Sequence, residues 1–509
     1  MSETMRKRLG LGPTGIVDEL RIVQDQILEH ALAYGLDPFR TVFELISHDE
    51  MNEVAGYGGF PTRYPHWCFG MEYEELRKGY NYGLSKIYEL VINNDPCYAY
   101  LMKSNAMVDQ KMVIAHVYGH SDFFKNNMWF SQTNRKMIDE MANHGTRIRR
   151  YVERYGEENV EQFLDAALSL ESLIDYHSVY SPGRQRSRYD FSGEEESQKE
   201  VQRFRSKGYM DRYINPPEFL ENQKTKIEEE MRKKKRFPEE PVRDVLEFLI
   251  EYAPLENWQR DILSIVREEA YYFAPQALTK IMNEGWATYW HSMLMANKVV
   301  DASEVVDFAD HHSSTLGTQP GVLNPYKLGV ELWRDIEDRW NKGKFGQDYE
   351  ECDDLEMKRT WNRELNEGRQ KIFEVRKIYN DLTFIDHFLT KEFAVQQNLF
   401  VYKHNSQSDQ HEISDRDFEA VKKNLLFRLT NRGHPMIQVV EGNFRNRAEL
   451  LLEHAHEGSD LDIRLAQDTL AKLHRVWQRP VNLKTVLDDQ VKIYSFDGEG
   501  HKEETVKDP

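Results

Sequence analysis

Apolar residues recur at helical spacing through most of the chain. From Gly15 to Gly35 they stand three or four positions apart, which places them on one face of an amphipathic helix. Similar patterns cover Tyr73–Asn93, Pro96–Asn126 and Glu157–Tyr176, and they return between Val242 and Phe400. These patterns predict a body built mainly of α-helices.

The pattern changes after Phe400. Three stretches have the β-branched, alternating character of strands, and helical patterns at 416–430 and 461–475 separate them. The strand-like stretches are LFVYKHN, PMIQVVEGNF and RAELLLEHAHEG. We therefore expect a mainly α protein with a small C-terminal α+β domain over 401–495 and a tail at 496–509.

A stretch of unusual composition separates the two helical regions. Residues 181–241 are poor in apolar side chains and contain successive blocks of acidic, basic and acidic residues. Such composition indicates a solvated helix face or a linker, and a docking arm for a protein partner is the alternative. We expect a helical region at 1–180, this charged insertion or linker at 181–241, and a second helical region at 242–400 that packs with the first as one domain.

The charge of the chain limits its partners. A formal net charge of −19 over 509 residues argues against general nucleic-acid binding and against stable contact with an anionic membrane. No apolar segment follows the basic N-terminal residues, and no run of about 18 apolar residues predicts a membrane span. The cysteines, Cys68, Cys97 and Cys352, form no CxxC pair, so we expect a reducing cytoplasm.

Two histidines stand four positions apart in the segment AHVYGHSDFF (115–124). In a helix this spacing places the His116 and His120 imidazoles on one face about one turn apart, which is the geometry that zinc requires from a helical pair. Ordinary core or surface histidines that bind no metal also occur at this spacing.

A second segment, IMNEGWATYWHSM (281–293), places Glu284 and His291 on one helix face. Its Asn-Glu-Gly-Trp resembles the second motif of the gluzincin metallopeptidases, in which the glutamate is the third zinc ligand. The resemblance implies that Glu284 is a ligand beside His116 and His120, with His291 as a fourth ligand or a proton shuttle. A buried helix with a structural carboxylate is the alternative.

The chain departs from the gluzincin pattern where the general base should be. Those enzymes have His-Glu-x-x-His, whose glutamate activates water, whereas Val117 follows His116 here and cannot take a proton. A base would have to come from elsewhere, and the candidates are Glu72, Asp122 and the noncoordinating His66. The side chains expected to line the cleft are His66, His312 and Tyr118.

Several long motifs resemble the stage V sporulation protein R (SpoVR) family. They are YPHWCFG (64–70), NNDPCYAYLM (93–102), GHSDFFKNN (119–127), MNEGWATYWH (282–291) and LNPYKLG (323–329). The resemblance covers nearly the whole chain. It implies a bacterial cytoplasmic protein that in spore formers takes part in building the spore cortex, a modified peptidoglycan. In other bacteria it implies a link with a PrkA-type serine kinase.

We therefore expect a metal-binding, zincin-like protein of sporulation or the stress response. Its cofactor would be a divalent metal, with Zn²⁺ as the expected ion, and its reaction would be hydrolysis of peptide or amide bonds. The alternative is a noncatalytic scaffold or regulator that works with a PrkA-type kinase complex, in which the histidines are structural. No phosphate-binding loop and no GxSxG motif occur, so nucleotide-dependent and serine-hydrolase chemistry have no support.

Overall fold

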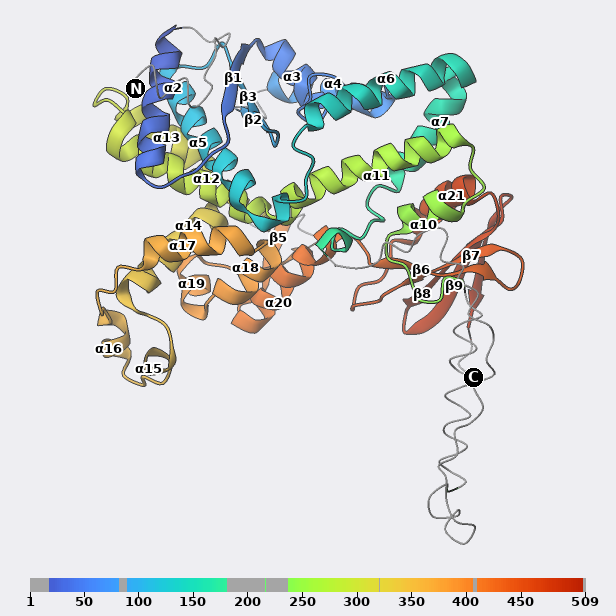
Figure 1. Cartoon of the computed structure of the whole chain (residues 1–509). Coiled ribbons are helices and arrows are strands. Elements are labelled where there is room, and N and C mark those ends of the chain that lie inside the picture. Colours follow the sequence, from blue (N-terminus) through green and yellow to red (C-terminus); the bar gives the residue numbers. More distant parts are fainter. Residues whose placement is uncertain are drawn as a thin grey trace, which may run out of the picture. The chain divides into compact units, whose positions relative to one another are not determined.

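The computed structural model describes residues 18–81, 89–180, 216, 237–319, 321–405 and 410–506. The chain forms two compact units, and each unit is assembled from two separated stretches of sequence. The first unit comprises residues 1–156 and 271–433, and the second comprises 157–270 and 434–509. Figure 1 labels most of the helices and strands of both units.

A three-stranded sheet lies in the first unit, in the order β1-β3-β2. Strand β1 (Thr41–Ile46) pairs in parallel with β3 (Cys97–Met102), and β2 (Glu89–Ile92) pairs antiparallel with β3. The helical patterns expected over Tyr73–Asn93 and Pro96–Asn126 are therefore wrong at β2 and β3. The two strands are rich in β-branched and aromatic residues and are joined by the turn sequence NNDP, so pairing with β1 outweighs the local helical spacing.

Five helices contribute many of the buried residues in the core of the first unit. They are α2 (Asp18–Ala33), α5 (Met107–Asn126), α12 (Lys280–Leu294), α14 (Pro325–Lys342) and α17 (Gly368–Ile378). Helix α12 contacts both α5 and α14, and nearly every residue of α12 is buried. Helix α14 has clear boundaries, because Asn324 caps its first turn, Pro325 opens it and Gly343 ends it in a left-handed conformation.

Glycines allow these helices to approach one another closely. A Cβ atom added at Gly119 of α5 would lie 2.6 Å from the Cα atom of Ala287 on α12. A Cβ atom added at Gly285 of α12 would lie 2.4 Å from the carbonyl carbon of Gly329 on α14. Because real Cβ atoms do not come this close, the three helices pack backbone to backbone at these points.

The first unit contains further described elements, some of which also contribute buried residues to this core. They are the helices α3 (His48–Gly56), α4 (Trp67–Asn81), α6 (Met137–Tyr155), α13 (Val305–Thr315), α15 (Gln347–Glu350), α16 (Leu355–Thr360), α18 (Asp381–Phe388), α19 (Lys391–Gln396) and α20 (Phe418–Leu429), the short helical turns η1 (Met128–Phe130), η3 (Met295–Val299) and η4 (Thr430–Gly433), and the hairpin of β4 (Val401–Asn405) and β5 (Gln410–Asp415).

The second unit contains a five-stranded sheet in the order β10-β9-β8-β7-β6. Strands β7 and β8 are parallel, and the other neighbours are antiparallel. The strands are β6 (Ile437–Phe444), β7 (Glu449–His454), β8 (Val481–Leu487), β9 (Gln490–Phe496) and β10 (His501–Thr505). The helices are α7 (Glu157–Ser169), η2 (Ser178–Tyr180), α10 (Val245–Tyr252) and α21 (Ile463–Trp477), and α11 (Asn257–Leu278) runs across the boundary into the first unit.

The predicted fold class, mainly α with a small C-terminal sheet domain, is confirmed. The two units do not follow the segments expected from the sequence. Residues 157–180 belong with 434–509, and the hairpin β4–β5 belongs to the first unit. A division into compact units does not test the expected domain boundaries, which stay a prediction. The expected tail at 496–509 contains β10, because the turn sequence DGEG returns the chain onto β9. Most of the charged segment 181–241 lies outside the described residues.

Among the described residues, none of the helices has the length and apolar character that crossing a bilayer requires.

Candidate metal centre

Two buried helices and one strand bring four donor side chains together in the first unit. His116 and His120 come from α5, Glu284 comes from α12, and Glu89 comes from the first position of β2. One ligand atom from each of the four lies within 4.8 Å of the other three. The contact of Gly119 with Ala287 lies between the two helices that carry three of these residues, so their close approach depends on that glycine.

The distances between donors match the edges of a coordination tetrahedron. The Nε2 atom of His116 lies 3.1 Å from Glu89 Oε1 and 3.6 Å from Glu284 Oε2. The Nε2 atom of His120 lies 3.7 Å and 3.4 Å from the same two oxygens. Donors about 2.0–2.2 Å from a tetrahedral zinc ion are about 3.3–3.6 Å apart. The donor set therefore has the size that such an ion needs.

Two of the facing atoms lack a hydrogen-bond partner. His116 Nε2 and Glu284 Oε2 are buried and make no hydrogen bond, although each lies close to other donors of the cluster. Both atoms lie within ion-pair distance of oppositely charged groups, but neither makes a well-directed hydrogen bond to them. A cation bound between these atoms would satisfy both of them.

The second ring nitrogens of the histidines are held by neighbours. His120 Nδ1 lies 2.9 Å from Asn283 Oδ1. An amide oxygen only accepts, so Nδ1 carries a proton, and Nε2 can present its lone pair to the cluster when a metal ion displaces the second proton. His116 Nδ1 lies 2.7 Å from His291 Nδ1, and His291 Nε2 lies 3.0 Å from His312 Nδ1. When His116 Nε2 is a ligand, each histidine in this chain donates to the next.

Charge complementarity dominates the electrostatics of the cluster. Burial raises the pKa of Glu89, but His116 and His120 outweigh burial and lower that pKa to about 2. Burial likewise opposes the charged form of His120, but Glu284 and Glu89 raise its pKa to about 10. For the same reasons the pKa of Glu284 is lowered and that of His116 is raised. A cation in the site would take over the role of these protons.

Burial keeps the outer histidines neutral. It lowers the pKa of His291 well below the usual value, and the nearby His116 and His312 lower it further. Burial also lowers the pKa of His312, with a smaller contribution from Arg334. Neutral imidazoles can each donate one hydrogen bond and accept one, as the chain from His116 to His312 requires.

Tyr326, in the first turn of α14, lies beside the cluster. Its ring centroid is 6.2 Å from that of His116. Burial raises the pKa of its hydroxyl, and the carboxylates of Glu284 and Glu89 raise it further. Tyr326 therefore keeps its proton and can donate it in a hydrogen bond.

His291 is not one of the four donors, although we expected it as a fourth ligand. Both of its ring nitrogens face other histidines, so neither is directed to the cluster. The fourth donor is Glu89, which motif analysis did not single out. Glu89 begins a strand rather than continuing a helix, and no spacing rule connects it with residues on α5.

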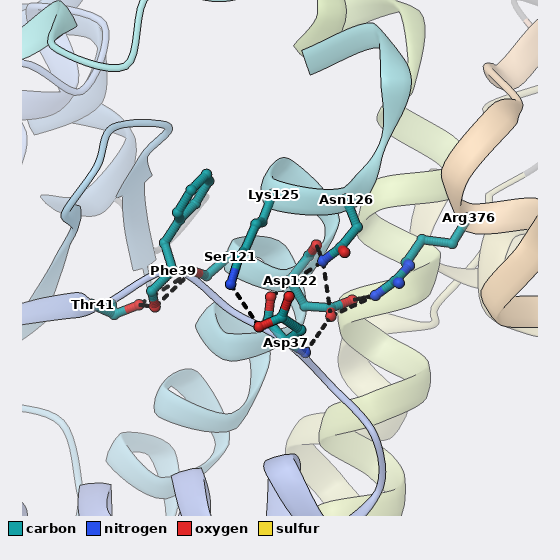
Figure 2. Close-up of polar contacts among 8 residues, drawn as sticks. All are labelled: Asp37, Phe39, Thr41, Ser121, Asp122, Lys125, Asn126 and Arg376. Atoms are coloured by element: carbon teal, nitrogen blue, oxygen red, sulfur yellow. Dashed lines mark hydrogen bonds and ion pairs between the residues drawn. The ribbon is translucent and has the colours of Figure 1, made fainter. Parts of the chain in front are cut away.

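Asp122 is committed to structural contacts and not to the donor cluster. Figure 2 shows its carboxylate between Arg376 and the backbone of Asp37. Trp286 Nε1 also donates to it, at 2.8 Å. These partners occupy both oxygens of a fully buried side chain, so Asp122 is poorly suited to act as the general base.

The other predicted site residues lie in different surroundings. Tyr118 is buried in the core with its ring edge-on to Phe43, and Glu72 is exposed on α4. His66 precedes α4, and its Nδ1 atom is 2.9 Å from the sulfur of Cys68. His312 adjoins the cluster through His291 and stacks on Phe308.

The fold and the site together define a mainly helical protein with a buried cluster of two histidines and two glutamates that can hold a metal ion. The chain belongs to the SpoVR family. The family model described as SpoVR like protein matches residues 16–434, and the SpoVR-like C-terminal domain matches residues 435–488. These matches confirm the family predicted from the motifs.

The protein YcgB of Escherichia coli (strain K12) is similar over nearly its whole length. The two chains are 30% identical over 508 residues, which cover 95% of this chain and 94% of YcgB. No solved structure matches this chain.

Proposed function

We propose that Glu89, His116, His120 and Glu284 form a divalent-metal centre and that the protein is a metal-dependent hydrolase. The observation that carries the metal centre is that four of the donor-to-donor distances, 3.1–3.7 Å, lie close to the edges of a tetrahedral site. Two nitrogen and two carboxylate donors suit zinc among the first-row metals.

In this proposal His116, His120 and Glu284 hold the metal, and Glu89 supplies the base that Val117 cannot. A divalent ion at this position would polarise a carbonyl group and lower the pKa of a bound water. Glu89 lies 3.1 Å from His116 Nε2 and reaches the cluster from a different element, so in this proposal its carboxylate is the group of the cluster that is left to accept a proton. Asn283 and His291 orient the two imidazoles.

Tyr326 completes the proposed active site. Its hydroxyl stays protonated beside two carboxylates, so it can donate a hydrogen bond to a polarised substrate oxygen. The proposed substrates are amide bonds, which include those of cortex peptidoglycan.

A structural metal centre in a noncatalytic scaffold is the second candidate. The near-equality of all four donor distances favours it, because four protein ligands would close the coordination shell. Val117 in place of a glutamate also favours it. Under this proposal the protein acts through partners, of which a PrkA-type kinase is the expected one.

Cobalt substitution separates the two candidates. Acetohydroxamate added to the Co²⁺ protein should change the visible spectrum if a coordination position is open. Glu89→Gln should then still bind one equivalent of cobalt, and Glu72→Gln, on an exposed part of α4, serves as the matched control. An unchanged spectrum together with loss of cobalt from Glu89→Gln would reject the hydrolase and leave the structural centre.

A further inference from the structure

A cysteine and a histidine that belong to none of the donor positions lie in contact at the start of α4. The sulfur of Cys68 is 2.9 Å from Nδ1 of His66, which immediately precedes the helix. The backbone amide of Cys68 also points to this nitrogen, at 3.4 Å. An amide N–H can only donate, so Nδ1 is the acceptor nitrogen and the thiol donates its proton to it.

The position of Cys68 favours its ionised form. It is the second residue of a helix that runs from Trp67 to Asn81, where the aligned peptide dipoles give a partial positive charge. A thiol at a helix N-terminus beside an imidazole is the arrangement that produces reactive thiolates. Cys68 is half-buried, whereas His66 is almost fully buried, so the cysteine is the more exposed residue of the two.

We propose that Cys68 is a nucleophilic thiol, activated by His66, that reacts with hydrogen peroxide. His66 Nδ1 takes the thiol proton, and the thiolate attacks one peroxide oxygen. An S–O bond forms as the O–O bond breaks, so the sulfur loses two electrons to the peroxide. The leaving hydroxide takes the proton from His66, and the products are a sulfenic acid and water. This inference is independent of the metal centre.

The chain provides its own controls for a labelling experiment. Cys352 is half-buried in another part of the sequence and lies in no such pair among the described contacts. Cys97 is fully buried, and burial raises the pKa of its thiol to about 12. It therefore labels only when the protein unfolds.

The test is the rate of iodoacetamide labelling of each cysteine in the native protein, read by peptide mass spectrometry between pH 6 and 9. Cys68 should react at least about tenfold faster than Cys352 at pH 7, and His66→Gln should remove the difference. Dimedone should trap a sulfenic acid at Cys68 after treatment with hydrogen peroxide. Equal rates for Cys68 and Cys352, or a fast Cys68 that His66→Gln leaves unchanged, would overturn the proposal.

If His66→Gln unfolds and exposes Cys97, the pH dependence of the Cys68 labelling rate in the wild-type protein tests the proposal instead. A labelling rate of Cys68 that has already reached its plateau below pH 7 supports activation of the thiol by His66. A rate that rises about tenfold per pH unit up to pH 8 contradicts it, because that is the behaviour of an ordinary thiol.

Discussion

Single hydrogen bonds decide which ring nitrogen each helical histidine turns to the cluster. Asn283 precedes Glu284 on α12, so one short segment provides both a donor and the residue that orients a second donor. The orientation of the His116 ring depends instead on His291, which lies about two turns beyond Glu284 on α12. The four donors and their supports thus form one connected group.

Removing the Asn283 oxygen should weaken metal binding without removing a donor. We expect Asn283→Ala to lower metal affinity about 10–100-fold, because the His120 ring loses the partner that fixes its tautomer. Competition with a chromophoric chelator measures the change. Asn283→Asp keeps an acceptor at the same position and should bind nearly as well as the wild type. Equal affinity for Asn283→Ala would show that the ring is oriented by other contacts.

Asp381 gives a pH dependence of known sign. Its carboxylate accepts from the amides of Ile281 and Met282, but burial dominates and raises its pKa to about 7. In the unfolded chain the group loses its proton near pH 4. The unfolded state therefore binds fewer protons between about pH 4 and 7, and the Asp381 contribution to stability falls as the pH rises through that window.

Urea unfolding of metal-free wild type and Asp381→Asn at several pH values tests this. The wild type should lose stability relative to the variant as the pH rises from about 4 to about 7. A stability difference that stays constant, or that changes in favour of the wild type, would contradict the burial argument.

At the scale of elements, α12 is held by close backbone contacts and by a hydrogen bond from Trp286 to the buried ion pair of Asp122 with Arg376. Gly285 meets Gly329 of α14, and Gly119 of α5 meets Ala287. Asp122 connects α5 with Arg376 of α17 (Figure 2). Trp286 of α12 also donates a hydrogen bond to Asp122. The relative placement of the donor-bearing helices depends on these contacts.

A methyl group at the α12–α14 contact should be costly. We expect Gly285→Ala to destabilise the protein by about 3 kcal/mol, because the added Cβ atom would meet backbone on the facing helix and backbone cannot easily yield. Gly70→Ala is the matched control, since Gly70 lies within α4 with nothing near its Cβ position. That change should be neutral or stabilise by up to about 1 kcal/mol. Similar free energies of unfolding for the two variants would refute the close approach.

Breaking the buried ion pair should cost much more than breaking an exposed one. Arg376→Met leaves the Asp122 carboxylate buried without its cation and should destabilise by about 3–5 kcal/mol. Adding Asp122→Asn should restore part of the loss. The exposed pair of Lys125 with Asp37 is the comparison, and Lys125→Met should cost less than about 1 kcal/mol. Equal costs in chemical denaturation would mean that the buried pair is not a structural connection.

Helical spacing explains why part of the site was predictable. Residues four apart on α5 must share a face, so His116 and His120 could be paired from the sequence alone. That Glu284 lies against them required the motif resemblance, because no local rule brings α12 to α5. Glu89 was missed, because its place follows from the pairing of β2 with β3, which the helical spacing of Tyr73–Asn93 concealed.

At the scale of the whole molecule, the first unit is built from two stretches of sequence that are far apart. The donors on β2 and α5 come from its first stretch and the donor on α12 comes from its second, so the cluster forms only when both are folded together. A ligand that binds the folded state alone adds stability that grows with its concentration above its dissociation constant. A bound metal would therefore stabilise the association of the two stretches.

The metal content of the native protein tests the central claim most directly. Protein made without an affinity tag, purified without chelators and supplied with Zn²⁺, should contain about one equivalent of metal per chain by elemental analysis. Glu284→Gln and His120→Ala should each contain little metal while keeping the helical circular dichroism of the wild type, and Glu72→Gln should contain as much metal as the wild type. A folded wild-type protein without metal, or Glu284→Gln protein with a full equivalent, would contradict the assignment of the cluster as a metal centre.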